Sequence, residues 1–179
     1  MEGLSIRFLV DLPEQGQLLL DRRHAPWLVA LSYVIASVGS LSTLTIARHL
    51  DQVQRRSMRL VWGLLGGLCL AGAIWSMHFI GMLAFQAPVA IRYDLATTVL
   101  SLLVALAAAL LAVYYMATPR SALSRQLLAA IIIGLGISAM HYSGMAAIRS
   151  PAEAYYQGDL FALSVGIAIS ASFAALLLN

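Results

Sequence analysis

Histidine and methionine recur together at two places in this chain, in the same order and spacing. The first copy reads Ser76-Met77-His78-Phe79-Ile80-Gly81-Met82 and the second reads Ala139-Met140-His141-Tyr142-Ser143-Gly144-Met145, which separates the two histidines by 141 − 78 = 63 residues. Each copy lies late in a long apolar stretch. Because an apolar interior rarely needs the same histidine twice in the same register, this internal repeat indicates a functional site.

The spacing within each copy places the candidate ligands on one side of a helix. Positions four apart share a helix face, so His78 projects with Met82 and His141 projects with Met145. Imidazole and thioether are neutral ligands, and thioether sulfur favours Cu(I). Zinc more usually recruits thiolate or carboxylate groups, which these stretches do not offer beside the histidines. The sequence therefore predicts one shared copper site made by His78, Met82, His141 and Met145.

Three further residues are secondary candidates for the same site. Met77 and Met140 lie about 100° around the helix from their histidines. His24 precedes the first apolar stretch, on the side where both motifs end. Packing is the alternative role for the motif side chains, because methionine fills gaps between helices and membrane histidines form interhelical hydrogen bonds. For His24 the alternative is a histidine of an interfacial loop. The second copy in register favours a site over packing.

The elements that must hold these residues are membrane helices. The chain is 61% hydrophobic and only 11% charged, with a mean hydropathy of +0.85. Basic residues do not form runs interleaved with aromatic residues, so nucleic acid is not a predicted partner. Apolar stretches of about 19 to 27 residues are long enough to cross a hydrocarbon layer of ~30 Å as helices. We expect an N-terminal extramembrane segment (1–23) and an all-α bundle of five transmembrane helices (24–179), with spans at about 26–47, 60–87, 95–118, 126–148 and 160–178.

The distribution of arginine predicts the orientation of the chain in the membrane. All 11 basic residues are arginine, and the segment 48–59 carries four of them against one aspartate. The segment 119–125 carries two more and no acidic residue, whereas the other side holds seven of the eight acidic residues. Because arginine-rich loops stay in the cytoplasm, we expect a periplasmic N-terminus and a cytoplasmic C-terminus.

Serines in the other three helices indicate that these helices repeat as well. Ser32, Ser101 and Ser164 follow comparable apolar starts and are spaced by 101 − 32 = 69 and 164 − 101 = 63 residues. The predicted unit is a plain helix with small residues followed by a helix with the histidine motif. The fifth helix then begins an incomplete third unit, and a sixth helix would be expected downstream in a longer parent chain.

The two motifs resemble those of the MHYT domain, a bacterial integral-membrane sensory domain named for its Met-His-Tyr-Thr sequence. The surrounding pattern agrees, including Pro26-Trp27-Leu28-Val29-Ala30-Leu31-Ser32 and Tyr93-Asp94, and the resemblance covers nearly the whole chain from His24 onward. Phe79 and Ile80 replace Tyr-Thr in the first copy, and Ser143 replaces Thr in the second. The methionine and histidine positions are intact, so these departures leave metal ligation unaffected.

This resemblance implies a sensor in the bacterial inner membrane. Such a domain is expected to bind copper near the periplasmic face, to sense a diatomic gas (oxygen, carbon monoxide or nitric oxide), and to relay the signal to a cytoplasmic effector such as a cyclic-di-GMP enzyme. The expected partners are the lipid bilayer, the gas, the effector and, as one option, a second copy of the chain. The chain itself is expected to be a sensor module rather than an enzyme, with no catalytic residues.

Two alternative functions remain open at this point. A membrane protein with haem b would use His78 and His141 as axial ligands. A copper carrier would need further polar or methionine steps along a path, and the other halves of these helices lack them.

Overall fold

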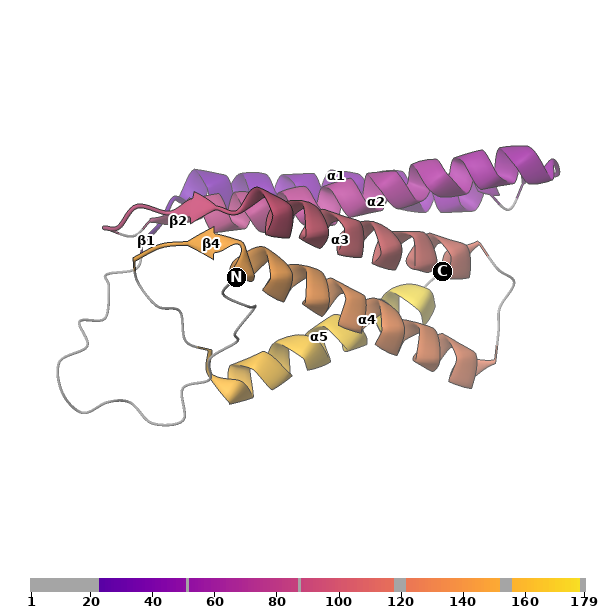
Figure 1. The fold of residues 1–179 in the computed structure, drawn as a ribbon. Helices are drawn as coiled ribbons and strands as arrows, with labels where there is room; N and C mark the ends of the chain where they lie inside the picture. Colours follow the sequence, from indigo (N-terminus) through magenta and orange to yellow (C-terminus); the bar gives the residue numbers. More distant parts are fainter. Residues whose placement is uncertain (1–22, 51, 87, 118–121, 152–155, 178–179) are drawn as a thin grey trace.

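The chain forms five long helices that run back and forth, as the computed structural model shows (Figure 1). The structure describes residues 23–50, 52–86, 88–117, 122–151 and 156–177. The predicted N-terminal segment lies outside the described residues except for Arg23, and so does the C-terminal residue Asn179.

Apolar composition and length make each helix suited to a membrane. The helices are α1 (Pro26–Leu50), α2 (Arg56–Ala84), α3 (Leu95–Met116), α4 (Leu123–Ala146) and α5 (Gly158–Leu177). All five are between 20 and 29 residues long and carry apolar stretches with a mean hydropathy of at least 1.7. The predicted all-α architecture with five membrane-spanning helices is therefore confirmed, and the chain is a multi-pass membrane protein.

Two short antiparallel ribbons at one end of the bundle were not predicted. Strand β1 (Arg23–His24) pairs with β2 (Phe85–Gln86), and β3 (Arg92–Tyr93) pairs with β4 (Ile148–Arg149). Two helices therefore end earlier than hydropathy indicated. Helix α2 ends at residue 84 instead of 87, and α4 ends at residue 146 instead of 148. The physical reason is that the chain beyond each helix becomes extended and pairs with a neighbouring segment.

At the opposite end, several helices extend further than predicted. Helix α1 ends at Leu50 rather than near residue 47, α2 begins at Arg56 rather than near 60, and α4 begins at Leu123 rather than near 126. Hydropathy marks the part of a helix that lies in hydrocarbon, whereas arginine and leucine continue a helix into the interface because both are good helix formers. Helices α3 and α5 differ from the predicted spans by about two residues at one or both ends, which is within ordinary end fraying.

Consecutive helices pack closely where one of them carries glycine. A Cβ atom added at Gly39 of α1 would lie 2.1 Å from the Cβ of Ala73 in α2. One added at Gly134 of α4 would lie 2.6 Å from the Cα of Ile169 in α5. Both contacts are possible only without a side chain, as expected for membrane helices that associate through small residues.

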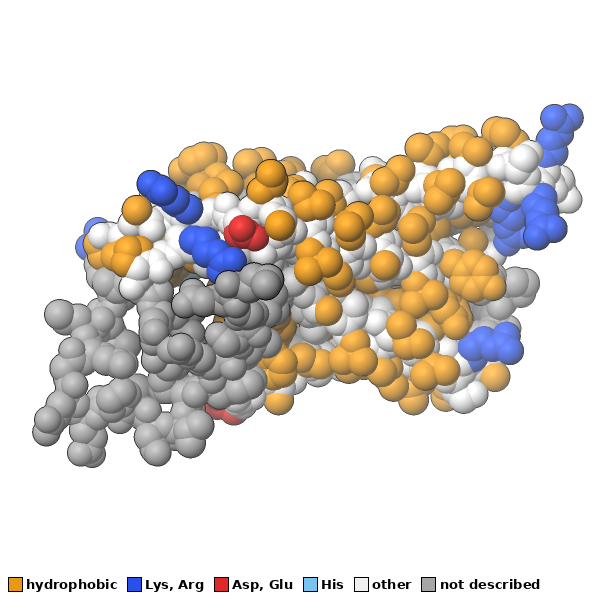
Figure 2. Space-filling view, viewed as in Figure 1, with side chains coloured by type: hydrophobic (Ala, Val, Ile, Leu, Met, Phe, Trp, Pro, Cys, Tyr) orange, Lys and Arg blue, Asp and Glu red, His pale blue; other side chains and the backbone are white. Residues whose placement is uncertain are grey.

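The interior consists mainly of small side chains, and the large apolar ones face outward. One core cluster joins Ala71 of α2, Ala105 and Ala109 of α3, and Met140 of α4. Figure 2 shows hydrophobic side chains over the middle of the molecule and arginine side chains gathered at its two ends. This distribution suits a bundle whose flank contacts lipid chains and whose ends contact headgroups and water.

The three serines that suggested a repeat have the same local structure. The hydroxyl groups of Ser32, Ser101 and Ser164 each donate to the carbonyl oxygen three residues earlier, at 2.7, 2.7 and 2.8 Å. Several other described helical hydroxyls, such as those of Ser37 and Thr43, bond to the carbonyl four residues earlier, while Ser143 of α4 also bonds to the carbonyl three residues earlier. The three repeated serines therefore share one local geometry, which is not confined to α1, α3 and α5.

Candidate metal centre

The bundle brings the two motif histidines into direct contact, although they are 63 residues apart. His78 lies in the last two turns of α2 and His141 in the last two turns of α4. Their Nδ1 atoms are 3.2 Å apart, and their ring centroids are 4.7 Å apart. The structure thus places the two motif histidines side by side at the interface of α2 and α4.

His78 is almost enclosed by protein. It is 8% exposed, and its Nε2 atom has no hydrogen-bond partner among the described residues. A Cβ added at Gly144 of α4 would lie 2.5 Å from this Nε2 atom and 2.9 Å from Cδ2 of the same ring. The motif glycine of α4 is thus what allows the His78 ring to lie against the α4 backbone. The equivalent glycine of α2, Gly81, has open space where a Cβ would stand.

One aromatic side chain of each motif helix bonds to a repeated serine of the next helix, an arrangement that we did not predict. The Nε1 group of Trp75 donates to Ser101 Oγ at 3.1 Å. Tyr142 Oη and Ser164 Oγ are 2.6 Å apart. The Ser164 hydroxyl also donates to the carbonyl oxygen of Phe161 at 2.8 Å, an arrangement that is compatible with donation from Tyr142 to Ser164. The sequence signal that could have indicated these bonds is the spacing of Ser101 and Ser164, which are 63 residues apart like the two histidines.

These bonds connect the histidine pair to the neighbouring plain helices. Phe79 and Tyr142, which follow the two histidines, pack edge-on against His78 and His141 at centroid distances of 5.4 and 4.9 Å. Tyr142 also contacts Phe161 of α5 at 4.5 Å. A displacement of His141 would therefore reach α5 through Tyr142.

The four motif methionines differ in burial: Met82 and Met140 are buried, whereas Met77 and Met145 are half-buried. Met82 is buried one helical turn beyond His78, and Met145 is half-buried one turn beyond His141. The uninterrupted helices preserve the predicted i, i+4 relation for both pairs. Met140, a secondary candidate, is 2% exposed and belongs to the alanine core cluster. The other secondary candidate, Met77, is half-buried.

The structure does not bring His24 to the histidine pair. His24 is exposed in β1 and packs edge-on against Phe85 of β2 at a centroid distance of 5.7 Å. Among the described residues, no group of three or more His, Cys, Asp or Glu side chains is arranged to hold a metal ion.

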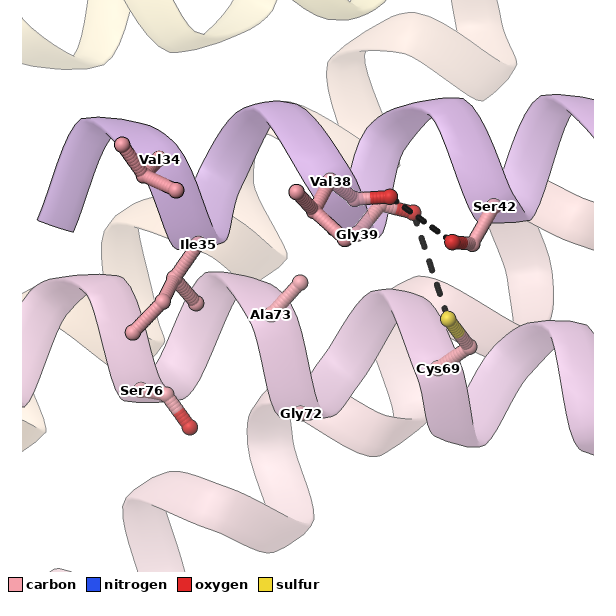
Figure 3. Close-up of a pocket in the computed structure, with 9 residues that line it drawn as sticks. All are labelled: Val34, Ile35, Val38, Gly39, Ser42, Cys69, Gly72, Ala73 and Ser76. Atoms are coloured by element: carbon pink, nitrogen blue, oxygen red, sulfur yellow. Dashed lines mark hydrogen bonds between the residues drawn. The ribbon is translucent and has the colours of Figure 1, made fainter. Parts of the chain in front are cut away.

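A separate groove runs between α1 and α2, and the histidine pair does not line it (Figure 3). Cys69 projects toward α1, with its Sγ atom 4.0 Å from the carbonyl oxygen of Gly39. The single cysteine thus packs against the α1 backbone. The lining residues are Val34, Ile35, Val38, Gly39, Ser42, Cys69, Gly72, Ala73 and Ser76.

The five apolar helices, together with the contact between buried His78 and half-buried His141, define a multi-pass membrane protein with a polar site between its two motif helices. The family model described as a bacterial signalling protein N-terminal repeat, MHYT, matches residues 72–130 and again residues 134–179. The chain belongs to this MHYT family. Each matched segment begins within a motif helix, α2 or α4, and covers the plain helix that follows it, α3 or α5.

Several curated signalling proteins are similar to this chain. The cyclic di-GMP phosphodiesterase NbdA of Pseudomonas aeruginosa is 48% identical over 98% of the chain. The bifunctional diguanylate cyclase/cyclic di-GMP phosphodiesterase MucR of the same organism is 39% identical over 83%, and the signaling protein YkoW of Bacillus subtilis is 30% identical over 83%. The aligned regions are 22%, 22% and 18% of those proteins, so the chain spans about a fifth of their length. No solved structure matches the chain.

Proposed function

We propose that this chain is the metal-binding sensor module of a signalling protein, with copper held by His78, His141, Met82 and Met145. The observation that carries the proposal is the 3.2 Å contact between the two Nδ1 atoms. Two nitrogen ligands of one ion lie about this far apart when each bond is ~2.0–2.1 Å long. The same distance also fits an N–H···N hydrogen bond, so the contact suits the metal-free pair as well.

The chemistry of the surrounding donors favours copper. His78 and His141 supply two neutral nitrogens, and Met82 and Met145 lie one helical turn beyond them on the same helix faces. Copper, when bound, supplies an ion that can take a small diatomic ligand. Haem is less suitable here, because axial histidines need the macrocycle between their rings, whereas these rings are in contact.

The relatives support a role in cyclic di-GMP signalling. Two of them are named as cyclic di-GMP enzymes, and the chain matches only about a fifth of each. We propose that the chain senses oxygen, carbon monoxide or nitric oxide in the inner membrane and relays the signal to a cytoplasmic effector, without being an enzyme itself. The route begins at His141 and passes through the Tyr142–Ser164 bond to α5.

The proposal makes a graded prediction for the four motif methionines. Leucine retains most of the volume of methionine but removes the sulfur. Met82→Leu and Met145→Leu are expected to weaken Cu(I) binding strongly, whereas Met77→Leu and Met140→Leu should change it little. Competition titration with a Cu(I) chelator measures the affinities, and the second pair of variants is the matched control. Equal affinity in all four variants and the parent would limit the site to the histidines.

The proposed orientation places the motifs near the periplasmic face. Arg55, Arg56 and Arg59 lie at the end of the bundle opposite to the ribbons, and this end is predicted to be cytoplasmic. A topology reporter fused after Gln54 should therefore read cytoplasmic, and one fused after Ala90 should read periplasmic. The reverse result would place the histidine pair near the cytoplasmic face and would overturn the orientation.

A further inference from the structure

The ribbon formed by β3 and β4 places two arginines directly opposite each other at the motif end of the bundle. Arg92 of β3 is the register partner of Arg149 of β4, and both side chains are exposed. Residues directly opposite in an antiparallel pair project from the same face, with Cβ atoms about 4.5–5.5 Å apart. Like charges in this position repel each other and are destabilising. We propose that Arg92 and Arg149 together bind the phosphate of an anionic phospholipid headgroup.

The neighbouring acidic residue does not neutralise this pair. Asp94 caps α3, and its Oδ1 atom accepts hydrogen bonds from the backbone N–H and the hydroxyl of Thr97, at 2.9 and 2.6 Å. These bonds hold the pKa of Asp94 below its usual range, and Arg149 contributes to the same effect more weakly. Two guanidinium groups and one carboxylate leave the ribbon with a net positive charge at neutral pH. A phosphate can accept paired hydrogen bonds from each planar guanidinium.

The position of the ribbon in the bundle favours a lipid over a soluble anion. Leu95, at the first turn of α3, is 76% exposed, and Val99 and Leu103 continue the exposed apolar surface along the helix. In a membrane this surface contacts acyl chains, so the ribbon just beyond it lies at the depth of the lipid phosphates. A phospholipid can then satisfy both features at once, with its phosphate on the arginines and its chains along α3.

Lipid retention by the purified full chain tests this site. Native mass spectrometry would measure the affinity for phosphatidylglycerol and for phosphatidylcholine with the same acyl chains. The double variant Arg92→Gln/Arg149→Gln is expected to lower the affinity for phosphatidylglycerol about 30-fold. This value assumes that each arginine contributes ~1 kcal/mol to lipid binding. Arg92→Lys/Arg149→Lys should give an intermediate loss, because lysine retains the charge but not the paired donors. The matched control is Arg55→Gln/Arg56→Gln, which removes two exposed arginines at the other end.

The outcomes distinguish a bound phospholipid from a soluble anion and from nonspecific retention of lipid. Loss of phosphatidylglycerol in the ribbon glutamine variant, with retention in the control variant, supports the site. Unchanged affinity in the ribbon variant, or equal affinity for phosphatidylcholine in the parent, overturns it. Displacement of the lipid by millimolar inorganic phosphate would assign the arginines to a soluble phosphate and would overturn the lipid assignment. The lysine variant guards against misfolding, since it preserves the charge of the ribbon.

Discussion

Replacing either motif histidine by alanine is expected to remove most of the bound copper while the protein stays in the membrane. His78 and His141 face each other through the same ring nitrogen at 3.2 Å, so an ion shared by them loses a ligand in either variant. Changing residues that only support a metal ligand typically costs 10–100-fold in affinity, so loss of a ligand should cost ~100-fold or more. Metal analysis of the purified variants, together with Cu(I) competition titration, measures the effect.

His49→Ala is the control for this prediction. His49 is exposed in the last turn of α1 and packs edge-on against Trp62 at 4.8 Å, away from the motif pair. Copper content should be unchanged in this variant. If His78→Ala and His141→Ala both retain the copper of the parent, the two histidines do not share an ion.

The second large effect is expected at Gly144. The added methyl group of Gly144→Ala would lie 2.5 Å from Nε2 of His78, closer than atoms can pack. The buried His78 ring contacts Phe79 and His141, so we expect the shift that makes room for the methyl group to disturb its contact with His141. We expect Gly144→Ala to lower copper affinity ~10-fold or more, through displacement of His78.

Gly81→Ala is the matched variant, because it makes the same change at the same motif position of the other helix. A methyl group there meets open space, and alanine is a better helix former than glycine by up to ~1 kcal/mol. Copper affinity should therefore be unchanged and thermal stability in detergent unchanged or higher. Equal copper affinities for the two alanine variants would contradict the packing of His78 against α4.

The membrane helices and the meeting of the motifs could be predicted from simple physical signals. In lipid, a single apolar stretch can satisfy the hydrogen bonds of its own backbone only as a helix. Length and hydropathy were therefore enough to locate all five membrane helices. The repeat of the histidine motif after 63 residues indicated that His78 and His141 belong to one site, and the structure places their rings in contact. The repeated serines Ser101 and Ser164 carried a further signal, which the structure explains by their bonds to Trp75 and Tyr142.

Other features depended on tertiary structure. Strands of two residues have no periodicity, so the pairing of Arg92 with Arg149 was invisible in the sequence. The direct contact of the imidazole rings depends on α2 and α4 approaching past α3, which no local pattern specifies. The two motif glycines have the same sequence context, yet only Gly144 lies against a histidine.

The metal content and optical spectrum of the purified protein test the central claim most directly. A copper site at His78, His141, Met82 and Met145 predicts one copper for each chain, little iron, and no Soret band. The copper should be absent from the His78→Ala/His141→Ala double variant. Iron with an intense Soret band would instead assign the histidines to haem, and a parent protein that takes up no more copper than the double variant would contradict the site altogether.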